Sequence, residues 1–250
     1  MARDTIKKIT LIASQNESSC ARLLDLGANP DTIHTTGSLK FDSNLSADTE
    51  TTENLRRIAG NRRVVVFAST RSGEEKDILQ SYIELNEKLD ALLVIVPRHP
   101  ERFDEVHKLI TDNKLNVKRR SENEPCNDDT EILLGDSMGE LMSYYSICDI
   151  AFIGGSLTRD GGQNMLEAAT ISKPVLFGPH VFNFEHISQL LLDNNGAVQI
   201  SDADQLMHTI AELLLDEVRR VAIGKNAKKI IEVNRGATKQ LIELLTQQIN

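Results

Sequence analysis

The chain has 250 residues, no Trp and a formal net charge of −9, which allow one large or two small domains with a substantial core. The acidic balance argues against a nucleic-acid-binding face, and the shortage of aromatic residues argues against a stacking platform for single strands. Cys20, Cys126 and Cys148 are too few and too scattered for a disulfide framework, which favours a reducing compartment. Cys148 lies in an apolar run and is expected to be buried.

The N-terminal part of the chain predicts a short βαβ segment. Residues 6–13 read as a strand, residues 16–26 as a helix and Ile33–Thr35 as a second short strand. Residues 43–52 are polar and lack apolar periodicity, which predicts a linker. We therefore expect a first segment over residues 1–45.

The segment at 62–68 contains a continuous apolar run with three β-branched residues, which is typical of a buried parallel strand. From here strands and helices alternate, which predicts a doubly wound, Rossmann-like α/β sheet over residues 46–232. The other strands are expected at 91–96, 116–119, 131–134, 149–153, 174–177 and 197–200. Helices are expected at 52–60, 73–89, 100–112, 138–146, 164–172 and 183–193, with further helices after residue 200 and a C-terminal helix over 233–250. No apolar run approaches the length of a membrane span.

Four polar loops follow four of these strands, at 69–75, 97–102, 135–140 and 154–167. Because ligands bind at the carboxyl ends of the strands in such sheets, we expect these loops to converge on one site. No loop contains a GxGxxG, GxxxxGK[ST], HExxH or CxxC pattern, so neither a nicotinamide site, nor a P-loop, nor a tight metal site is expected. No cofactor is predicted.

The loop after the strand at 149–153 contains two glycine pairs, at 154–155 and 161–162, followed by Asn164 and Glu167. Glycines let backbone approach a ligand, and the N-terminus of a helix offers N–H groups to a phosphate. Glu167 suits a sugar diol, and Asn164 would project from the same helix face. This pattern predicts a nucleotide-sugar site. The alternative is that Asn164 caps the helix and Glu167 faces solvent.

Three other residues carry the same ambiguity. Arg98 is held between two prolines and could pair with a phosphate, or it could be a surface arginine in a rigid turn. Gly139 could present backbone N–H groups at a helix start, or the loop 135–140 could be only a helix cap. Lys40 lies near the expected linker, where a lone lysine is usually a surface residue but could face a developing negative charge.

The run LLGDSMGELMSYYSICDIAFIGGSLTRDGGQNMLEAATISKPVLFGPHVFNF resembles the donor-binding half of the 3-deoxy-D-manno-octulosonic acid (Kdo) transferases, and VPRHPERF and TTGSLKFD match that family in order. The resemblance implies the C-terminal half of a GT-B fold, which consists of two Rossmann-like domains. It also implies an inverting, metal-independent glycosyltransferase that transfers Kdo from CMP-Kdo to the lipid A precursor in lipopolysaccharide biosynthesis. The parent enzyme is then expected at the cytoplasmic face of the inner membrane of Gram-negative bacteria.

The resemblance also assigns residues. It implies that the donor is bound by Pro97, Arg98, Met138, Gly139, Glu140, Asn164, Met165, Leu166 and Glu167, with Gly155, Ser156 and Gly162 as further candidates. It gives Lys40 the role of stabilising the transition state. The chain departs from the family pattern at Arg71, Ser72 and Gln163, to which no role is assigned, and at Met165 and Ala168, where the family has proline.

Kdo transferases carry an N-terminal acceptor domain with a membrane-associating segment and a glutamate general base, and residues 1–45 resemble only the end of that domain. We therefore expect a soluble C-terminal piece that binds CMP or CMP-Kdo without turnover. The lipid A precursor and the membrane would contact the other half, and no nucleic-acid partner is expected. Two alternatives stay open: the donor half of a GT-B enzyme that uses a UDP-sugar, and a non-enzymatic nucleotide-binding or docking module.

Overall fold

The computed structural model describes residues 2–43, 46–85 and 89–249. They divide into two compact units: unit 1 contains residues 1–44 and 231–250, and unit 2 contains residues 45–230. The C-terminal segment, which the sequence analysis set apart as a helix of its own, thus groups with the N-terminal residues.

Unit 1 contains a small parallel sheet. The strand predicted over residues 6–13 is wrong, because Ala2–Ile6 form helix α1 and the strand β1 is only Ile12–Ser14. The N–H groups of Lys8 and Ile9 donate to the carbonyls of Thr5 and Ile6 in a turn, so they are not available to a strand ladder. β1 pairs with β2 in a two-stranded sheet. The other elements of this unit are α2 (Glu17–Asp25), η1 (Pro30–Thr32), β2 (Ile33–Thr35), η2 (Leu39–Asp42) and α11 (Ala237–Ile249).

Asp42 fixes the start of the C-terminal helix. Its carboxylate accepts hydrogen bonds from the N–H groups of Gly236, at 2.7 Å, and Thr238, at 2.6 Å. These two bonds lower the pKa of Asp42, as expected for a carboxylate at a helix N-terminus.

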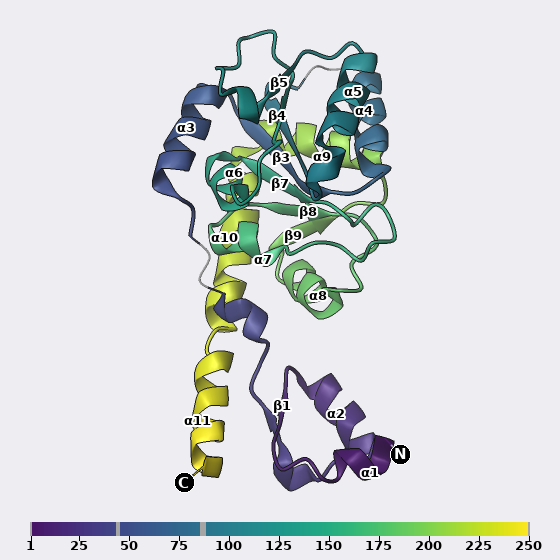
Figure 1. Cartoon of the computed structure of the whole chain (residues 1–250), viewed down its shortest axis with the longest axis vertical. Coiled ribbons are helices and arrows are strands. Elements are labelled where there is room, and N and C mark those ends of the chain that lie inside the picture. The colour runs from purple at the N-terminus through teal and green to yellow at the C-terminus, as the bar shows by residue number, and fades with distance from the viewer. Residues whose placement is uncertain (1, 44–45, 86–88, 250) are drawn as a thin grey trace. The chain divides into compact units, whose positions relative to one another are not determined.

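Unit 2 is a seven-stranded, wholly parallel sheet in the order β5-β6-β4-β3-β7-β8-β9 (Figure 1). This confirms the predicted doubly wound α/β fold. The strands are β3 (Val64–Thr70), β4 (Leu92–Pro97), β5 (Val117–Arg119), β6 (Ile132–Leu134), β7 (Ile150–Ile153), β8 (Val175–Phe177) and β9 (Ala197–Gln199). The chain leaves β3 toward β4 and later returns to its other side as β7, so the topological switch point lies between β3 and β7.

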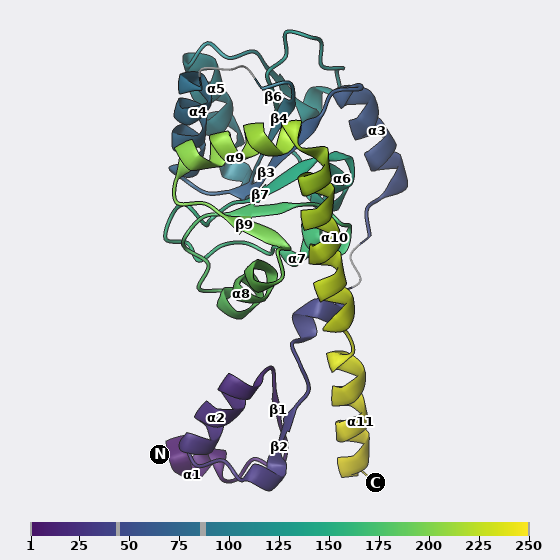
Figure 2. The same cartoon turned by 180° about the vertical axis from the view of Figure 1, so that it is seen from behind.

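Helices cover both faces of this sheet. On one face α4 contacts both α5 and α9, and α9 runs across the sheet (Figure 2), while α3, α6 and α7 form the layer on the other face. The helices are α3 (Thr49–Ala59), α4 (Glu74–Glu84), α5 (Phe103–Asp112), α6 (Leu141–Ile147), α7 (Leu166–Thr170), α8 (Glu185–Asp193), α9 (Ala203–Leu215) and α10 (Glu217–Val233), with short η3 (Pro100–Arg102) and η4 (Arg120–Glu122) turns. α3 begins inside the predicted linker, because Asp48 caps it by accepting from Thr51 N at 2.7 Å.

The core lies between the sheet and these helices. Every residue of β3 and β4 is buried, as the β-branched runs predict. At the centre the rings of Phe67 and Phe152 are tilted by 53° with centroids 6.0 Å apart. Cys148 is buried, as expected, and desolvation raises the pKa of its thiol to about 12. No helix among the described residues is both long and apolar enough to cross a membrane.

Candidate functional site

An open cavity of about 310 Å³ lies at the carboxyl edge of the unit 2 sheet. The end of β3 and the segments that follow β4, β6 and β7 all contribute to its lining, so the predicted convergence of four segments at this edge is confirmed in space. The lining residues are Ser69, Arg98, Gly139, Leu141, Met142, Tyr145, Gln163, Asn164 and Glu167. The cavity therefore lies beside the switch point, where sheets of this kind bind ligands.

One side of the cavity depends on a close backbone approach between β3 and β7. Ser69 has a φ of 55° and lies where the register between β3 and β4 shifts, a bulge that turns the end of the strand. Gly154, just after β7, packs against this bulge: a Cβ there would lie 2.6 Å from the Ser69 carbonyl oxygen. Gly154, which was predicted to leave room for a ligand, thus leaves room for the backbone of β3 instead.

Asn164 and Glu167 lie together in the cavity lining, but Asn164 precedes the helix. The predicted helix over 164–172 is shorter than expected, because α7 begins at Leu166, whose N–H is accepted by the Asn164 side chain at 3.2 Å. The Asn164 amide also donates to Glu167 Oε1 at 3.1 Å. Burial raises the pKa of Glu167, although the Asn164 hydrogen bond and the Arg98 charge oppose this effect. The pair therefore offers one fixed amide and one partly desolvated carboxylate.

Arg98 supplies the positive charge of the site. It follows Pro97, the last residue of β4, and its N–H donates to the Thr70 carbonyl at 3.0 Å, which ties this loop to β3. Within the described ranges, its guanidinium forms no ion pair. The planar fork of this side chain is thus available to a phosphate.

Tyr145 is a lining residue that the sequence analysis missed. It lies on α6 and is 1% exposed, and burial together with the Glu167 charge raises its pKa well above the usual value. The phenol therefore stays neutral and can donate a hydrogen bond into the cavity. Two tyrosines, Tyr144 and Tyr145, stand side by side in the sequence, and only the orientation of α6 decides which of them faces the cavity.

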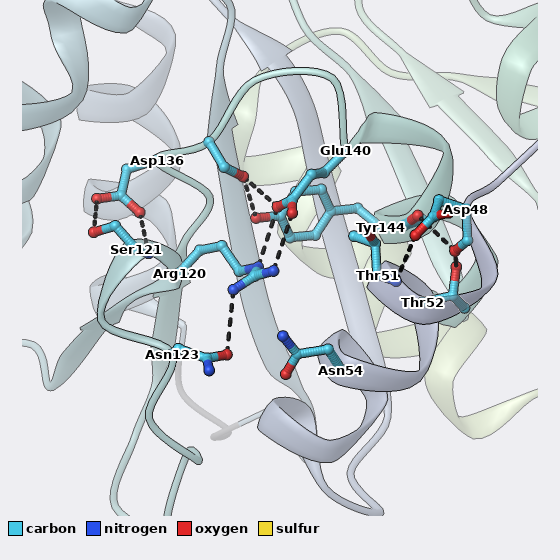
Figure 3. A network of polar contacts seen from close by, with 12 residues as sticks. Asp48, Thr51, Thr52, Asn54, Arg120, Ser121, Asn123, Asp136, Glu140 and Tyr144 are labelled. Carbon is cyan, nitrogen blue, oxygen red and sulfur yellow. Dashed lines mark hydrogen bonds and ion pairs between the residues drawn. The ribbon is translucent and has the colours of Figure 1, made fainter.

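The other predicted donor-binding residues differ in how much of each is exposed and in which groups they contact. Met138 is 56% exposed, whereas Met165 and Leu166 are buried at 0% and 2%. The side chains of the latter two belong to the core, so only their backbone is available to a ligand. Glu140 is held by Arg120, with 3.0 Å between its carboxylate and the guanidinium, and also accepts from Ser137. Figure 3 shows Arg120 facing Glu140, with Asn123 on the other side of the guanidinium.

Asp136 anchors the loop that carries Gly139. Its carboxylate accepts from the Ser121 N–H at 2.8 Å (Figure 3). It also pairs with Arg119 at 2.7 Å. Burial alone would raise the pKa of Asp136, but the Ser121 hydrogen bonds and Arg119 outweigh it and hold the pKa below its usual value. The side chain of Asp136 is 3% exposed, so this pairing is shielded from solvent.

We expect Asp136→Asn to lower the free energy of unfolding at pH 7 by about 2 kcal/mol. A depressed pKa stabilises the fold above the unfolded value, near pH 4, and this stabilisation is lost as the pH falls through the folded pKa. The difference between wild type and variant should therefore shrink on acidification, as measured by urea unfolding at several pH values. Asp104→Asn removes the 88% exposed partner of the same Arg119 and should change little. A constant difference at all pH values would contradict this role for Asp136.

Gly155, Ser156 and Gly162 lie beside the site but present no open donors. The N–H groups of Gly155 and Ser156 donate to the carboxylate of Glu74, and the N–H of Gly162 donates to the Gly155 carbonyl at 2.7 Å. The space expected next to Gly161 and Gly162 is filled by the loop 181–183, in which Phe182 is 64% exposed.

Lys40 belongs to unit 1. It lies in η2 and lines a second open cavity, of about 330 Å³, together with Ala13, Gln15, Thr36, Gly37, Ser38, Leu39 and Leu241. Its expected role toward the donor stays a prediction, since the Arg98 cavity is in unit 2. Across the described part of the chain, no group of three or more His, Cys, Asp or Glu side chains could hold a metal ion.

Comparison with known proteins places the chain in a family. The family "Glycosyl transferases group 1" matches residues 52–230, and the family "3-Deoxy-D-manno-octulosonic-acid transferase (kdotransferase)" matches residues 1–43. The C-terminal CMP-Kdo binding domain of WaaA from Acinetobacter baumannii is 32% identical with a TM-score of 0.68, over 74% of this chain and 99% of that domain. The chain belongs to the Kdo transferase family. Both the resemblance and the expected GT-B fold are confirmed.

Curated Kdo transferases are similar in sequence to this chain over most of its length. The Kdo transferase of Haemophilus influenzae is 40% identical over 95% of this chain, and that of Bordetella pertussis is 34% identical over 97%. The chain spans 57% and 58% of the length of these two relatives. Anabaena HepE in complex with UDP has a TM-score of 0.60 over 99% of this chain and 68% of its own, but at 14% identity this likeness shows the fold alone.

Proposed function

We propose that the cavity of unit 2 binds CMP-Kdo and that the chain is the donor-binding part of a Kdo transferase. The observation that carries this proposal is the likeness to a domain named for CMP-Kdo binding, which this chain covers to 99% at 32% identity. The cavity supports it independently, because the segments that follow β4 and β7 bring an arginine, an amide and a carboxylate together.

Each group in the cavity suits one part of CMP. Arg98 would pair with the phosphate through its guanidinium, and the backbone N–H groups near Gly139 would add donors. Glu167 would accept hydrogen bonds from the ribose hydroxyls, with Asn164 holding its orientation. Tyr145 would donate its phenol to a polar atom of the nucleotide. Pro97, Met138, Glu140, Met165 and Leu166 would contribute by shaping or presenting the backbone.

At the level of the whole enzyme, the proposal follows the family resemblance. The enzyme transfers Kdo to the lipid A precursor in lipopolysaccharide biosynthesis, with inversion and without a metal ion in the active site, at the cytoplasmic face of the inner membrane of Gram-negative bacteria. Residues 46–232 bind the donor, residues 1–45 contribute the end of the acceptor domain, and Lys40 stabilises negative charge in the transition state. This chain spans 57% of the length of the Haemophilus influenzae relative, and we expect it by itself to bind the donor without turnover.

Calorimetric titration tests the donor. We expect the chain to bind CMP and CMP-Kdo at least about tenfold more tightly than UDP-GlcNAc, because a site whose buried polar groups match cytosine leaves some of them unpaired with uracil. A UDP-sugar enzyme with the same fold would show the reverse order. Equal binding of the three ligands, or no binding of CMP, would contradict the proposal.

A further inference from the structure

A carboxylate of the protein itself occupies the anion-binding turn next to the cavity. Glu74 opens α4 and is 0% exposed. Its Oε2 accepts from the N–H groups of Arg71, at 2.8 Å, and Gly155, at 2.7 Å. Its Oε1 accepts from the N–H groups of Ser156 and Leu157, each at 3.0 Å. One side chain thus takes four backbone donors from the loops that follow β3 and β7.

Three consecutive N–H groups that point at one anion form the kind of concavity that commonly binds phosphate. Here Gly155 makes the turn possible with a φ of 68°. The same carboxylate also takes the N–H group of Arg71, in the loop that precedes α4. Burial raises the pKa of Glu74, whereas its four hydrogen bonds favour the charged form.

This filled turn lies directly behind the cavity wall. Two lining residues flank it: Ser69, whose carbonyl packs on Gly154, and Gln163. The Gln163 side-chain nitrogen would be 3.2 Å from a Cβ at Gly155, and the Gln163 N–H donates to the Gly154 carbonyl at 3.0 Å. A ligand that extends past these two residues therefore approaches the turn 155–157, which the buried Glu74 carboxylate fills from behind.

The charges of the lining fit a single phosphate. Among the described residues that line the cavity, Arg98 is the one cation and Glu167 the one anion. The Arg71 guanidinium, which lies outside the lining, contacts His99 Nε2 at 2.5 Å. A second phosphate that reaches the turn 155–157 would thus find the N–H donors of the turn taken by a carboxylate, and two like charges brought close together are strongly unfavourable.

We infer that Glu74 is a specificity-determining residue, which makes the cavity select a nucleoside monophosphate, linked directly to the sugar, over nucleoside diphosphates. This inference rests on the proposed function, because it takes the cavity to be the nucleotide site. Glu74 acts through the turn 155–157 and through its charge, and it does not touch the nucleotide.

The test compares CMP and CDP by calorimetry on the wild-type chain and on Glu74→Gln. In the wild type, CDP should bind at least about tenfold more weakly than CMP. Glu74→Gln removes the charge and turns one acceptor oxygen into a donor nitrogen. In this variant the CDP-to-CMP ratio of dissociation constants should fall by about fivefold or more. Glu75→Gln is the matched control: Glu75 is an equally buried carboxylate, but it pairs with the side chains of Thr70 and Arg102. Its CDP-to-CMP ratio should stay within about twofold of wild type.

The outcomes separate this inference from the proposed function. A wild-type chain that binds CMP but binds CDP equally well overturns the role of Glu74 and leaves the CMP site intact. An unchanged ratio in a folded Glu74→Gln variant also overturns it. If the wild type does not bind CMP at all, the proposed function falls, and this inference falls with it. If Glu74→Gln fails to fold, the CDP-to-CMP ratio of dissociation constants of the wild-type chain serves as the test of the inference.

Discussion

Glu167→Ala is expected to weaken CMP binding by about 10- to 100-fold. The reason is the loss of a carboxylate that accepts hydrogen bonds from the ribose hydroxyls, since a hydrogen bond to a charged group contributes about 1.5–3 kcal/mol. Glu167 is partly buried in the cavity and held by Asn164, so water cannot easily replace it. Calorimetry on the purified chain measures the change, and a melting curve verifies that the variant is folded.

Arg98→Ala should weaken CMP binding to a similar extent, since the phosphate loses its cation. Arg98→Lys should recover part of the affinity, because it restores the charge without the planar fork.

Glu185→Ala is the control for Glu167→Ala: Glu185 also lies in the first turn of its helix, but it is exposed and does not line the cavity. Unaltered CMP affinity in a folded Glu167→Ala variant would remove this residue from the site.

Gly154→Ala is expected to lower the free energy of unfolding by about 2–4 kcal/mol and the melting temperature by about 5–15 °C. The new Cβ would lie 2.6 Å from the Ser69 carbonyl oxygen and 2.7 Å from the Thr70 Cα. Both are backbone atoms of a buried strand, so neither can move aside as a flexible side chain could. The variant should also bind CMP more weakly, because Ser69 lines the cavity.

Ser72→Ala controls for this change. Ser72 is exposed in the loop that follows the same strand, so its loss should change the stability by less than about 0.5 kcal/mol. Thermal unfolding of both variants, followed by circular dichroism, measures the difference. A Gly154→Ala variant with the same melting temperature as the wild type would mean that β3 and β7 do not approach each other as closely as described.

The sheet of unit 2 could be predicted because its strands carry their own signal. The segments at 62–68 and 91–96 each contain an apolar run rich in β-branched residues, as strands buried on both faces must, and both strands are present. The convergence of the polar loops then followed from the topology of parallel sheets. The N-terminal strand was wrong because a short apolar alternation cannot be told from a helix and a turn when no buried sheet selects between them.

Glu74 could not be predicted in this role. Its partners Gly155, Ser156 and Leu157 lie 81 to 83 residues away in the sequence, and nothing local distinguishes its carboxylate from that of Glu75. The glycine pairs were interpreted as room for a ligand, whereas the structure uses them for backbone packing and for a turn around this carboxylate. Tyr145 was missed for a similar reason, since its orientation depends on how α6 packs.

The most direct test of the central claim is a crystal structure of the chain with bound CMP. We expect the phosphate within hydrogen-bond distance of the Arg98 guanidinium and the ribose hydroxyls at the Glu167 carboxylate, with Glu74 still accepting from the turn 155–157. CMP bound elsewhere on unit 2, or with its phosphate in place of the Glu74 carboxylate, would contradict the account.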